Sequence, residues 1–295
     1  MSWQRAAAQA KGAIGRSIPR FAYPFVLRTL TVLHAPTWAL PRWEYVPEGW
    51  ERSRVGGGIT GWEGSNVAEA YRRKRPEVLE ILRGSGPLAF PTSSLLPTGR
   101  RVLHDHNTIV TFGYVLALAG RNRRSLSVLD WGGGIGLHYH LGRALVPGLE
   151  LDYHVKEVAQ VCALGLELEP EVTFHEAEAC LERGYELVMT SASLQYEERW
   201  QSTLSKLALA ASDYLFLTRV PVVDHVASYV VHERGDSATD LETLSWVINR
   251  NELVKCASLA GATLVREFLI AFDPHVPGVP ERQETRAFLF RVSDQ

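Results

Sequence analysis

The chain has 295 residues, of which 46% are hydrophobic and 22% charged, and its formal net charge is −2. This hydrophobic content supports a buried core and excludes a disordered or collagen-like chain. Because the charges nearly balance, no overall field holds the protein on nucleic acid, and we expect no nucleic-acid partner. The three cysteines are scattered without paired spacing. This argues against a disulfide framework and favours a cytoplasmic protein with reduced thiols.

The first 50 residues are basic, with six lysines or arginines against two glutamates. Residues 21–40 are the one candidate for a membrane span, but Arg28, Pro24 and Pro36 interrupt them, which argues against a spanning helix. Two interpretations of residues 1–50 stay open. They form a peripheral arm that binds an anionic membrane surface, or an arm that packs on the main domain or on a second subunit.

The sequence pattern changes near residue 124. Before it, short apolar pieces are separated by proline and glycine, and one clear helix is predicted, from Asn107 to Ala119 with Gly120 after its end. After it, short apolar strands alternate with helices. We therefore expect an N-terminal helical and irregular extension that covers the active site, residues 1–124, and an α/β domain, residues 125–295.

Strand–helix alternation predicts a mostly parallel sheet with helices on both faces, which is the Rossmann-like α/β fold. We expect seven strands, and the last two should pair antiparallel because no helix separates them. The predicted strands are residues 125–130, 151–156, 171–174, 185–190, 213–219, 263–271 and 285–292. The predicted helices after residue 124 are 136–145, 158–168, 197–211 and 250–260.

The strongest motif follows the first of these strands, where open α/β sheets bind their ligands. Asp130 stands two residues before a glycine-rich loop that spans residues 132–136. The dinucleotide pattern G-x-G-x-x-G/A fails, because Leu137 or Tyr139 occupies its last position. A carboxylate at Asp130 would repel a pyrophosphate, but it suits a ligand with an ammonium group and no phosphate. S-adenosylmethionine is such a ligand. The cofactor residues predicted here are Asp130, Gly132, Gly133, Gly134 and Gly136.

Two further carboxylates follow the next two strands. Glu157 ends the second strand about 20 residues after the glycine loop, where an acid accepts hydrogen bonds from both ribose hydroxyls of a nucleotide. Glu176 lies just past the third strand and is a weaker candidate for the adenine edge, where a surface acid is the better explanation. Metal motifs of the CxxC kind are absent, and we expect no metal cofactor.

Three segments resemble a bacterial family assigned as class I S-adenosylmethionine-dependent methyltransferases, often encoded near surface-polysaccharide genes. The segments are Val128–Tyr139, Thr190–Tyr196 and Thr218–Pro221. They look like the family's triple-glycine cofactor loop, its Ser-Leu-Gln-Tyr sequence after the fourth strand and its Arg-x-Pro after the fifth. The resemblance runs from about residue 60 to the chain end. It implies the methyltransferase fold, S-adenosylmethionine as cofactor, and Ser191 among the cofactor-binding residues. Residues 224–242 match poorly and are expected to form a substrate lid.

Methyl transfer from a sulfonium mainly requires that the acceptor is aligned and that water is excluded. A hydroxyl acceptor also benefits from a base within about 3 Å. Gln195 and Tyr196, after the fourth strand, are expected near the methyl group, where Gln195 orients the acceptor and Tyr196 offers a hydroxyl or an aromatic face. His106, just before the Asn107 helix, is the preferred base.

We therefore expect a methyltransferase that acts on a small molecule, at a hydroxyl of a sugar, glycolipid or secondary metabolite. Two alternatives stay open: an N-methyltransferase of natural-product biosynthesis, and a non-catalytic relative that keeps the fold to bind a ligand or partner. The intact glycine loop argues against the second. A nucleic-acid methyltransferase is disfavoured, because neither an Asn/Asp-Pro-Pro-Tyr pocket nor a strongly basic face is present.

Overall fold

The computed structural model describes residues 43–51, 61–62, 66–88, 98–234 and 242–292, and the side chains of residues 66 and 98–102 are not described. The chain divides into two units, residues 1–42 and 43–295, and the second is described below. Most of the predicted N-terminal arm therefore lies outside the described residues, and the division at residue 124 stays a prediction. None of the helices in the described ranges is long and apolar enough to cross a membrane.

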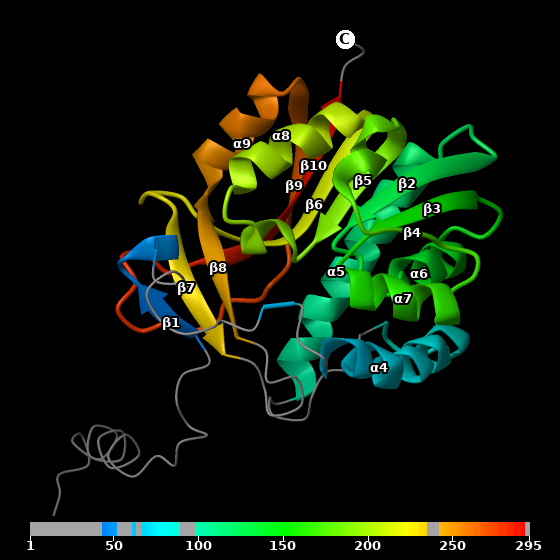
Figure 1. The fold of residues 1–295 in the computed structure, drawn as a ribbon, viewed down its shortest axis with the longest axis horizontal. Helices are drawn as coiled ribbons and strands as arrows, with labels where there is room; N and C mark the ends of the chain where they lie inside the picture. The colour runs from blue at the N-terminus through cyan, green and yellow to red at the C-terminus, as the bar shows by residue number, and fades with distance from the viewer. Residues whose placement is uncertain (1–42, 52–60, 63–65, 89–97, 235–241, 293–295) are drawn as a thin grey trace, which may run out of the picture. The chain divides into compact units, whose positions relative to one another are not determined.

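One sheet, of ten strands within the described residues, organises this unit (Figure 1). The strands are β1 Trp43–Val46, β2 Ser125–Trp131, β3 Glu150–Lys156, β4 Thr173–His175, β5 Tyr185–Ser191, β6 Ala211–Val223, β7 Tyr229–Arg234, β8 Glu242–Asn249, β9 Ala262–Leu269 and β10 Glu284–Val292. Seven of them lie in the order β4-β3-β2-β5-β6-β10-β9. Among these seven, only β10 runs in the opposite direction to the rest: it pairs antiparallel with β6 and β9, and the other pairs are parallel. The predicted mostly parallel sheet and its terminal antiparallel pair are confirmed.

Helices cover both faces of this sheet. They are α4 Asn66–Arg83, α5 Thr98–Ala119, α6 Leu137–Leu145, α7 Ala159–Leu168, α8 Trp200–Ala210 and α9 Arg250–Leu259, with the short 3₁₀ helices η2 Gly49–Glu51, η3 Glu178–Glu182 and η4 Leu194–Tyr196. Val128 and Leu187 pack in a core with α5 and α6, whereas Leu129 and Val188 pack in a second core with α8 and α9. Successive strand residues point to opposite faces, so strands buried on both sides read as continuous apolar runs.

Three strands that the sequence analysis does not predict extend the sheet beyond β6. β8 pairs in parallel with the last two residues of β6, and β7 and β1 follow in antiparallel order (Figure 1, lower left). Residues 224–242, expected as a substrate lid, thus contain β7. Its buried run is only four residues, Tyr229 to His232, and periodicity does not distinguish so short a run from a loop.

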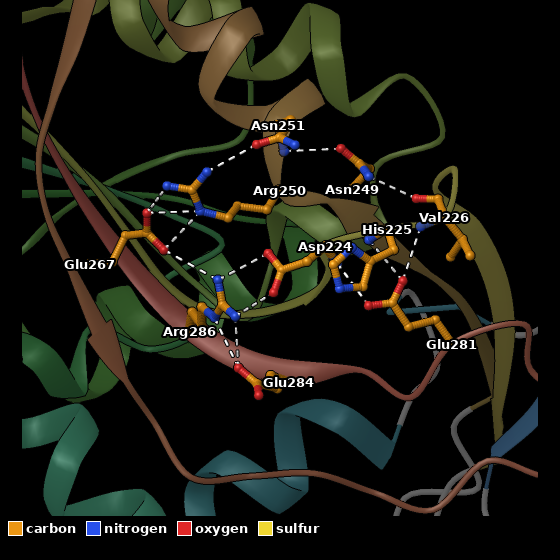
Figure 2. Close-up of polar contacts among 10 residues, drawn as sticks. All are labelled: Asp224, His225, Val226, Asn249, Arg250, Asn251, Glu267, Glu281, Glu284 and Arg286. Atoms are coloured by element: carbon orange, nitrogen blue, oxygen red, sulfur yellow. Dashed lines mark hydrogen bonds and ion pairs between the residues drawn. The ribbon is translucent and has the colours of Figure 1, made fainter.

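An ion-pair network ties this extension to the rest of the sheet (Figure 2). Arg286 of β10 binds Asp224, just after β6, with Nη2 2.7 Å from Oδ2. It also lies 3.4 Å from Glu267 of β9, which binds Arg250 at the start of α9. Glu284 contributes a third carboxylate, 2.8 Å from Arg286. The network fixes the end of β6 against β9, β10 and α9.

The turn after β6 is held by a single carboxylate, that of Glu281 (Figure 2). It accepts hydrogen bonds from the backbone N–H groups of residues 224–226, at 2.9–3.0 Å. Burial alone would raise the pKa of Glu281, but the three hydrogen bonds outweigh it and lower this pKa. The connection between β9 and β10 thereby sets the direction in which the chain enters β7.

Helix α4, which the sequence analysis does not predict, is held on α6 and α7 by Glu169. The Glu169 side chain is 3% exposed, and its two oxygens each lie 2.6 Å from a nitrogen, Nε of Arg75 in α4 and Nε2 of His140 in α6. Burial opposes ionisation of Glu169, but His140 and Arg75 outweigh it and lower its pKa. The sequence pattern does not predict α4, because Pro76 lies inside it and proline ordinarily ends a helix, and because basic residues precede Pro76.

We expect Glu169→Ala to lower the free energy of unfolding by about 2 kcal/mol, because it leaves two partners of a largely buried charge without a carboxylate. Denaturant titration measures this loss. The matched control is Glu167→Ala, which breaks an exposed pair with Arg72 on the same two helices and should change stability little. A loss for Glu169→Ala no larger than that of the control would contradict the assigned role.

Candidate functional site

The glycine-rich loop follows β2 and takes a shape that only glycine adopts without strain. Gly132, Gly134 and Gly136 have φ angles of +69°, +60° and +82°, in the left-handed region that L side chains rarely enter. The Gly132 N–H donates to the carbonyl oxygen of Lys156 at the end of β3, at 2.9 Å. A Cβ atom on Gly132 would lie 2.4 Å from Ser193. The loop is thus packed closely between the carboxyl ends of three neighbouring strands.

Asp130 lies fully buried beneath this loop. Its Oδ2 accepts a hydrogen bond from the Tyr153 hydroxyl at 2.9 Å and lies 3.3 Å from Nδ1 of His138. Its Oδ1 is buried and has no hydrogen-bond partner among the described residues. Burial and the adjacent Asp130 carboxylate raise the pKa of Tyr153, which therefore stays a donor. A buried carboxylate oxygen without a donor is costly, which favours a ligand that supplies one.

Glu157 follows β3 on the other side of the loop. Its Oε1 accepts from the Gly134 N–H at 3.2 Å, and its Oε2 accepts from the Val158 N–H at 2.8 Å. Burial raises the pKa of Glu157, against these two hydrogen bonds, which lower it. The structure thus brings Glu157 and the glycine loop into direct contact. Glu176 is exposed, in the bend after β4, and its predicted role at an adenine edge stays a prediction.

Tyr71 of α4 covers the loop and is a site residue that the sequence analysis does not identify. A Cβ atom on Gly134 would lie 2.7–2.8 Å from the Tyr71 ring and its hydroxyl. Burial, followed by the negative charge of Glu157, raises the pKa of Tyr71. Its hydroxyl is therefore a neutral donor facing the loop. The sequence feature that would have identified Tyr71 is the helical spacing of Val67, Tyr71 and Val78, which is typical of one buried helix face.

The carboxyl end of β5 and the part of β6 beside it form a second, polar part of the site. Ala192, just after β5, and Arg219, in β6, have φ angles of +57° and +58°. Such left-handed residues other than glycine cost on the order of 1–3 kcal/mol each and cluster at functional sites. Four buried atoms here have no hydrogen-bond partner among the described residues: Ser191 Oγ, Gln195 Oε1, Thr218 Oγ1 and Arg219 Nε.

Gln195 and Tyr196 lie in η4, directly after β5. Nε2 of Gln195 donates to the carbonyl oxygen of Arg219 at 3.4 Å, which links the ends of β5 and β6. The Tyr196 hydroxyl donates to Oε2 of Glu233 in β7 at 2.9 Å, and its ring meets that of Trp62 edge to face, with centroids 5.2 Å apart. Gln195 thus contacts β6 and Tyr196 contacts β7. The expected place of both residues near the methyl group, and their catalytic roles, stay predictions.

His104 and His106 both lie in α5 but point to different sides, since residues two apart on a helix do not face each other. Burial, and then the charge of Arg219, lower the pKa of His104 to about 4. His104 is therefore the histidine of this pair that lies near Arg219 of β6. His106 has a buried Nδ1 without a hydrogen-bond partner among the described residues, and its role as base stays a prediction.

The arrangement suits binding of a polar small molecule at the carboxyl edge of the sheet. One half, around Asp130 and Glu157, offers acceptors for cationic or hydroxyl groups. The other half, around Arg219, offers donors. No cluster of three or more His, Cys, Asp or Glu side chains able to hold a metal ion is found in the described part of the chain.

No family model and no curated protein matches the chain. Among solved structures it is similar to the magnesium protoporphyrin IX methyltransferase of Synechocystis PCC 6803 with bound S-adenosylmethionine, at 15% identity and a TM-score of 0.47 over 77% of this chain and 95% of that one. It is also similar to the 1,6-didemethyltoxoflavin N1-methyltransferase of Burkholderia thailandensis (15%, 0.44, 70% and 95%) and to a sugar N-methyltransferase of Streptoalloteichus (13%, 0.43, 71% and 100%). At this distance the case for function rests on the chain's own residues.

The lowered pKa of His104 predicts a loss of stability in acid. Between its ordinary pKa of 6.5 and its folded value of about 4, the unfolded chain binds a proton that the folded chain does not. The stabilising contribution is therefore present above pH 6.5 and is lost as the pH falls towards 4, by about 3 kcal/mol in all.

Urea titrations at pH 7 and pH 4.5 measure this loss in the wild type and in His104→Asn, which should lose much less stability between the two. The control is His275→Asn, which replaces an exposed histidine and should retain the wild-type pH dependence. If His104→Asn is as pH-dependent as the wild type, His104 does not have a lowered pKa.

Proposed function

We propose that the protein is an S-adenosylmethionine-dependent methyltransferase that acts on a small-molecule acceptor, at a hydroxyl of a sugar, glycolipid or secondary metabolite. The observation that carries the proposal is the glycine loop. It is left-handed at three glycines and lies between the buried Asp130 and the Glu157 carboxylate at the carboxyl ends of β2 and β3. A cytoplasmic location and the absence of a nucleic-acid partner stay predictions.

The residues present fit this cofactor. Oδ1 of Asp130, which has no hydrogen-bond partner among the described residues, is a carboxylate acceptor suited to the ammonium group. Glu157 is suited to the ribose hydroxyls. Ser191, with a buried hydroxyl that lacks a partner among the described residues, is proposed as a further cofactor contact. When bound, S-adenosylmethionine supplies a methyl group on a positively charged sulfonium.

The chain's own residues orient the acceptor and exclude water. Gln195 has an unpartnered Oε1 within the described residues and can accept a hydrogen bond from an acceptor hydroxyl. Tyr196 is fixed by Glu233 and Trp62, so its ring forms a rigid wall on the β7 side. Positioning of this kind lowers the barrier by several kcal/mol without any proton transfer. His106 is proposed as the base that takes the proton of a hydroxyl acceptor.

Two other functions are compatible with the same loop. Methylation of an amine needs no strong base, because an amine reacts in its deprotonated form, so a histidine would then be dispensable. A non-catalytic protein would bind the cofactor, or another ligand, without turnover. The experiments below separate these functions.

Calorimetric titration with S-adenosylhomocysteine tests the cofactor site. We expect the wild type to bind with a micromolar Kd, about −8 kcal/mol. Asp130→Asn and Glu157→Gln should each weaken binding at least tenfold, because each replaces a charged acceptor by a neutral amide. The matched control is Glu167→Gln, an exposed glutamate on α7, which should bind as the wild type does.

Absence of binding by a folded wild type would overturn the proposed function. Circular dichroism establishes that each variant is folded, since Asp130 is buried and its replacement also tests packing. Binding that neither Asp130→Asn nor Glu157→Gln weakens would place the cofactor elsewhere on the protein.

A screen of acceptors with labelled methyl donor tests the base. With a hydroxyl acceptor, His106→Ala should lower turnover by 10²-fold or more. An unchanged rate would remove His106 from the mechanism. An unchanged rate together with an amine product would favour the N-methyltransferase.

A further inference from the structure

Arg219 is the cationic side chain at the β5–β6 part of the candidate site within the described residues, and few of its donors have a protein partner. Its Nη2 donates to the carbonyl oxygen of Ser191 at 3.3 Å, and its Nε is buried without a hydrogen-bond partner among the described residues. No carboxylate of the described residues forms an ion pair with it, whereas Arg75, Arg250 and Arg286 each bind one. Charged groups that leave water are ordinarily paired, so a guanidinium held in this way favours an anion from outside the protein.

The backbone holds Arg219 in place at an energetic cost. Its φ of +58° is left-handed, and so is that of Ala192 on the neighbouring strand. The two strand ends are joined by hydrogen bonds, from Ala192 N–H to the Thr218 carbonyl at 3.0 Å and from Gln195 Nε2 to the Arg219 carbonyl at 3.4 Å. Residues with strained backbone angles persist only where surrounding contacts hold them, and they cluster at functional sites. Here the result is a guanidinium held beside the end of β5, where it donates to the Ser191 carbonyl.

The residues in contact with Arg219 or next to it in the chain carry further polar atoms that lack a partner within the described ranges. The hydroxyl oxygens of Ser191 and Thr218 and Oε1 of Gln195 are buried without a partner among the described residues. His104 faces the same guanidinium from α5 and, with its pKa lowered to about 4, stays neutral at physiological pH. These groups donate or accept hydrogen bonds, and none of them brings a competing negative charge to Arg219.

The sheet order places Arg219 on a different strand from the cofactor acids, and Tyr71 lies near both, since the charges of Glu157 and Arg219 both act on its hydroxyl. Asp130 and Glu157 follow β2 and β3, whereas Arg219 lies in β6, and β5 lies between β2 and β6.

A cofactor held over β2 and β3, with Ser191 at its edge, leaves Gln195, Thr218 and Arg219 for the second substrate. We propose that Arg219 binds a carboxylate or phosphate group of the methyl acceptor, so that the substrate is an anionic small molecule. This inference rests on the proposed function, since it takes the β2–β3 side as the cofactor side.

The test measures binding of inorganic phosphate to the protein saturated with S-adenosylhomocysteine, by calorimetry at low ionic strength. We expect the wild type to bind phosphate with a millimolar Kd. Arg219→Gln should weaken this binding at least tenfold, and Arg219→Lys should retain part of it, because lysine keeps the charge but not the planar donor pair. The control is Arg183→Gln, which replaces an exposed arginine at the amino end of β5 and should leave phosphate binding unchanged.

Three results would overturn the inference. They are the absence of phosphate binding to the wild-type complex, equal binding by Arg219→Gln, and an equal loss in Arg183→Gln. If Arg219→Gln does not fold, Arg219→Gly takes its place and is compared with Arg219→Lys. Equal phosphate affinity of these two variants would contradict a role of the positive charge at position 219.

A second arm distinguishes the acceptor from the cofactor as source of the anion. S-adenosylhomocysteine carries an amino-acid carboxylate, and 5′-methylthioadenosine does not. If Arg219→Gln weakens the first tenfold and leaves the second unchanged, Arg219 binds the cofactor's carboxylate and the assignment to the acceptor is wrong. If the wild type binds no S-adenosylhomocysteine but binds phosphate in an Arg219-dependent way, the proposed function fails while the anion site stands.

Discussion

A carboxylate at the end of a central parallel strand is expensive to bury, and the shape of the site follows from the way Asp130 is accommodated. Tyr153 from β3 and His138 from α6 both approach one of its oxygens. The chain that covers it must come so close that Gly133 could not carry a side chain, since a Cβ there would lie 2.5 Å from the Asp130 carboxyl carbon. The glycine loop is therefore a consequence of the buried acid as much as a cradle for a ligand.

The same constraint extends to the covering helix. Tyr71 can lie against Gly134 only while α4 stays on α6 and α7, and Glu169 holds it there through Arg75 and His140. His140 belongs to the helix that begins after the glycine loop. The glycine loop, α6 and α4 thus share one set of contacts. A substitution at Glu169 therefore affects the loop through α6 as well as through α4.

The sequence was informative where residue pattern and backbone geometry agree. The strand–helix alternation predicted all seven strands of the main sheet, and the glycines at positions 132, 134 and 136 predicted a loop after the first of them. The structure adds that these three glycines are left-handed. Tyr71 and β7 could not be predicted in this way. Tyr71 belongs to the site because a distant ion pair docks its helix, and β7 is a strand because Glu281 and β8 position it. Both depend on tertiary contacts that no local pattern encodes.

The two halves of the site differ in how much they say about function. Strands β2 and β3 carry a compact motif with its own acids, and such motifs recur on this fold with many substrates. Strand β6 continues past the edge of its neighbours and pairs with β8, which brings β7 and Glu233 to Tyr196. Under the proposed function, the residues that select an acceptor come from β5, β6 and this added part, because these elements lie beyond β2 and β3 in the sheet order. An arginine without a carboxylate partner among the described residues at that place is therefore more informative about the substrate than the glycine loop is.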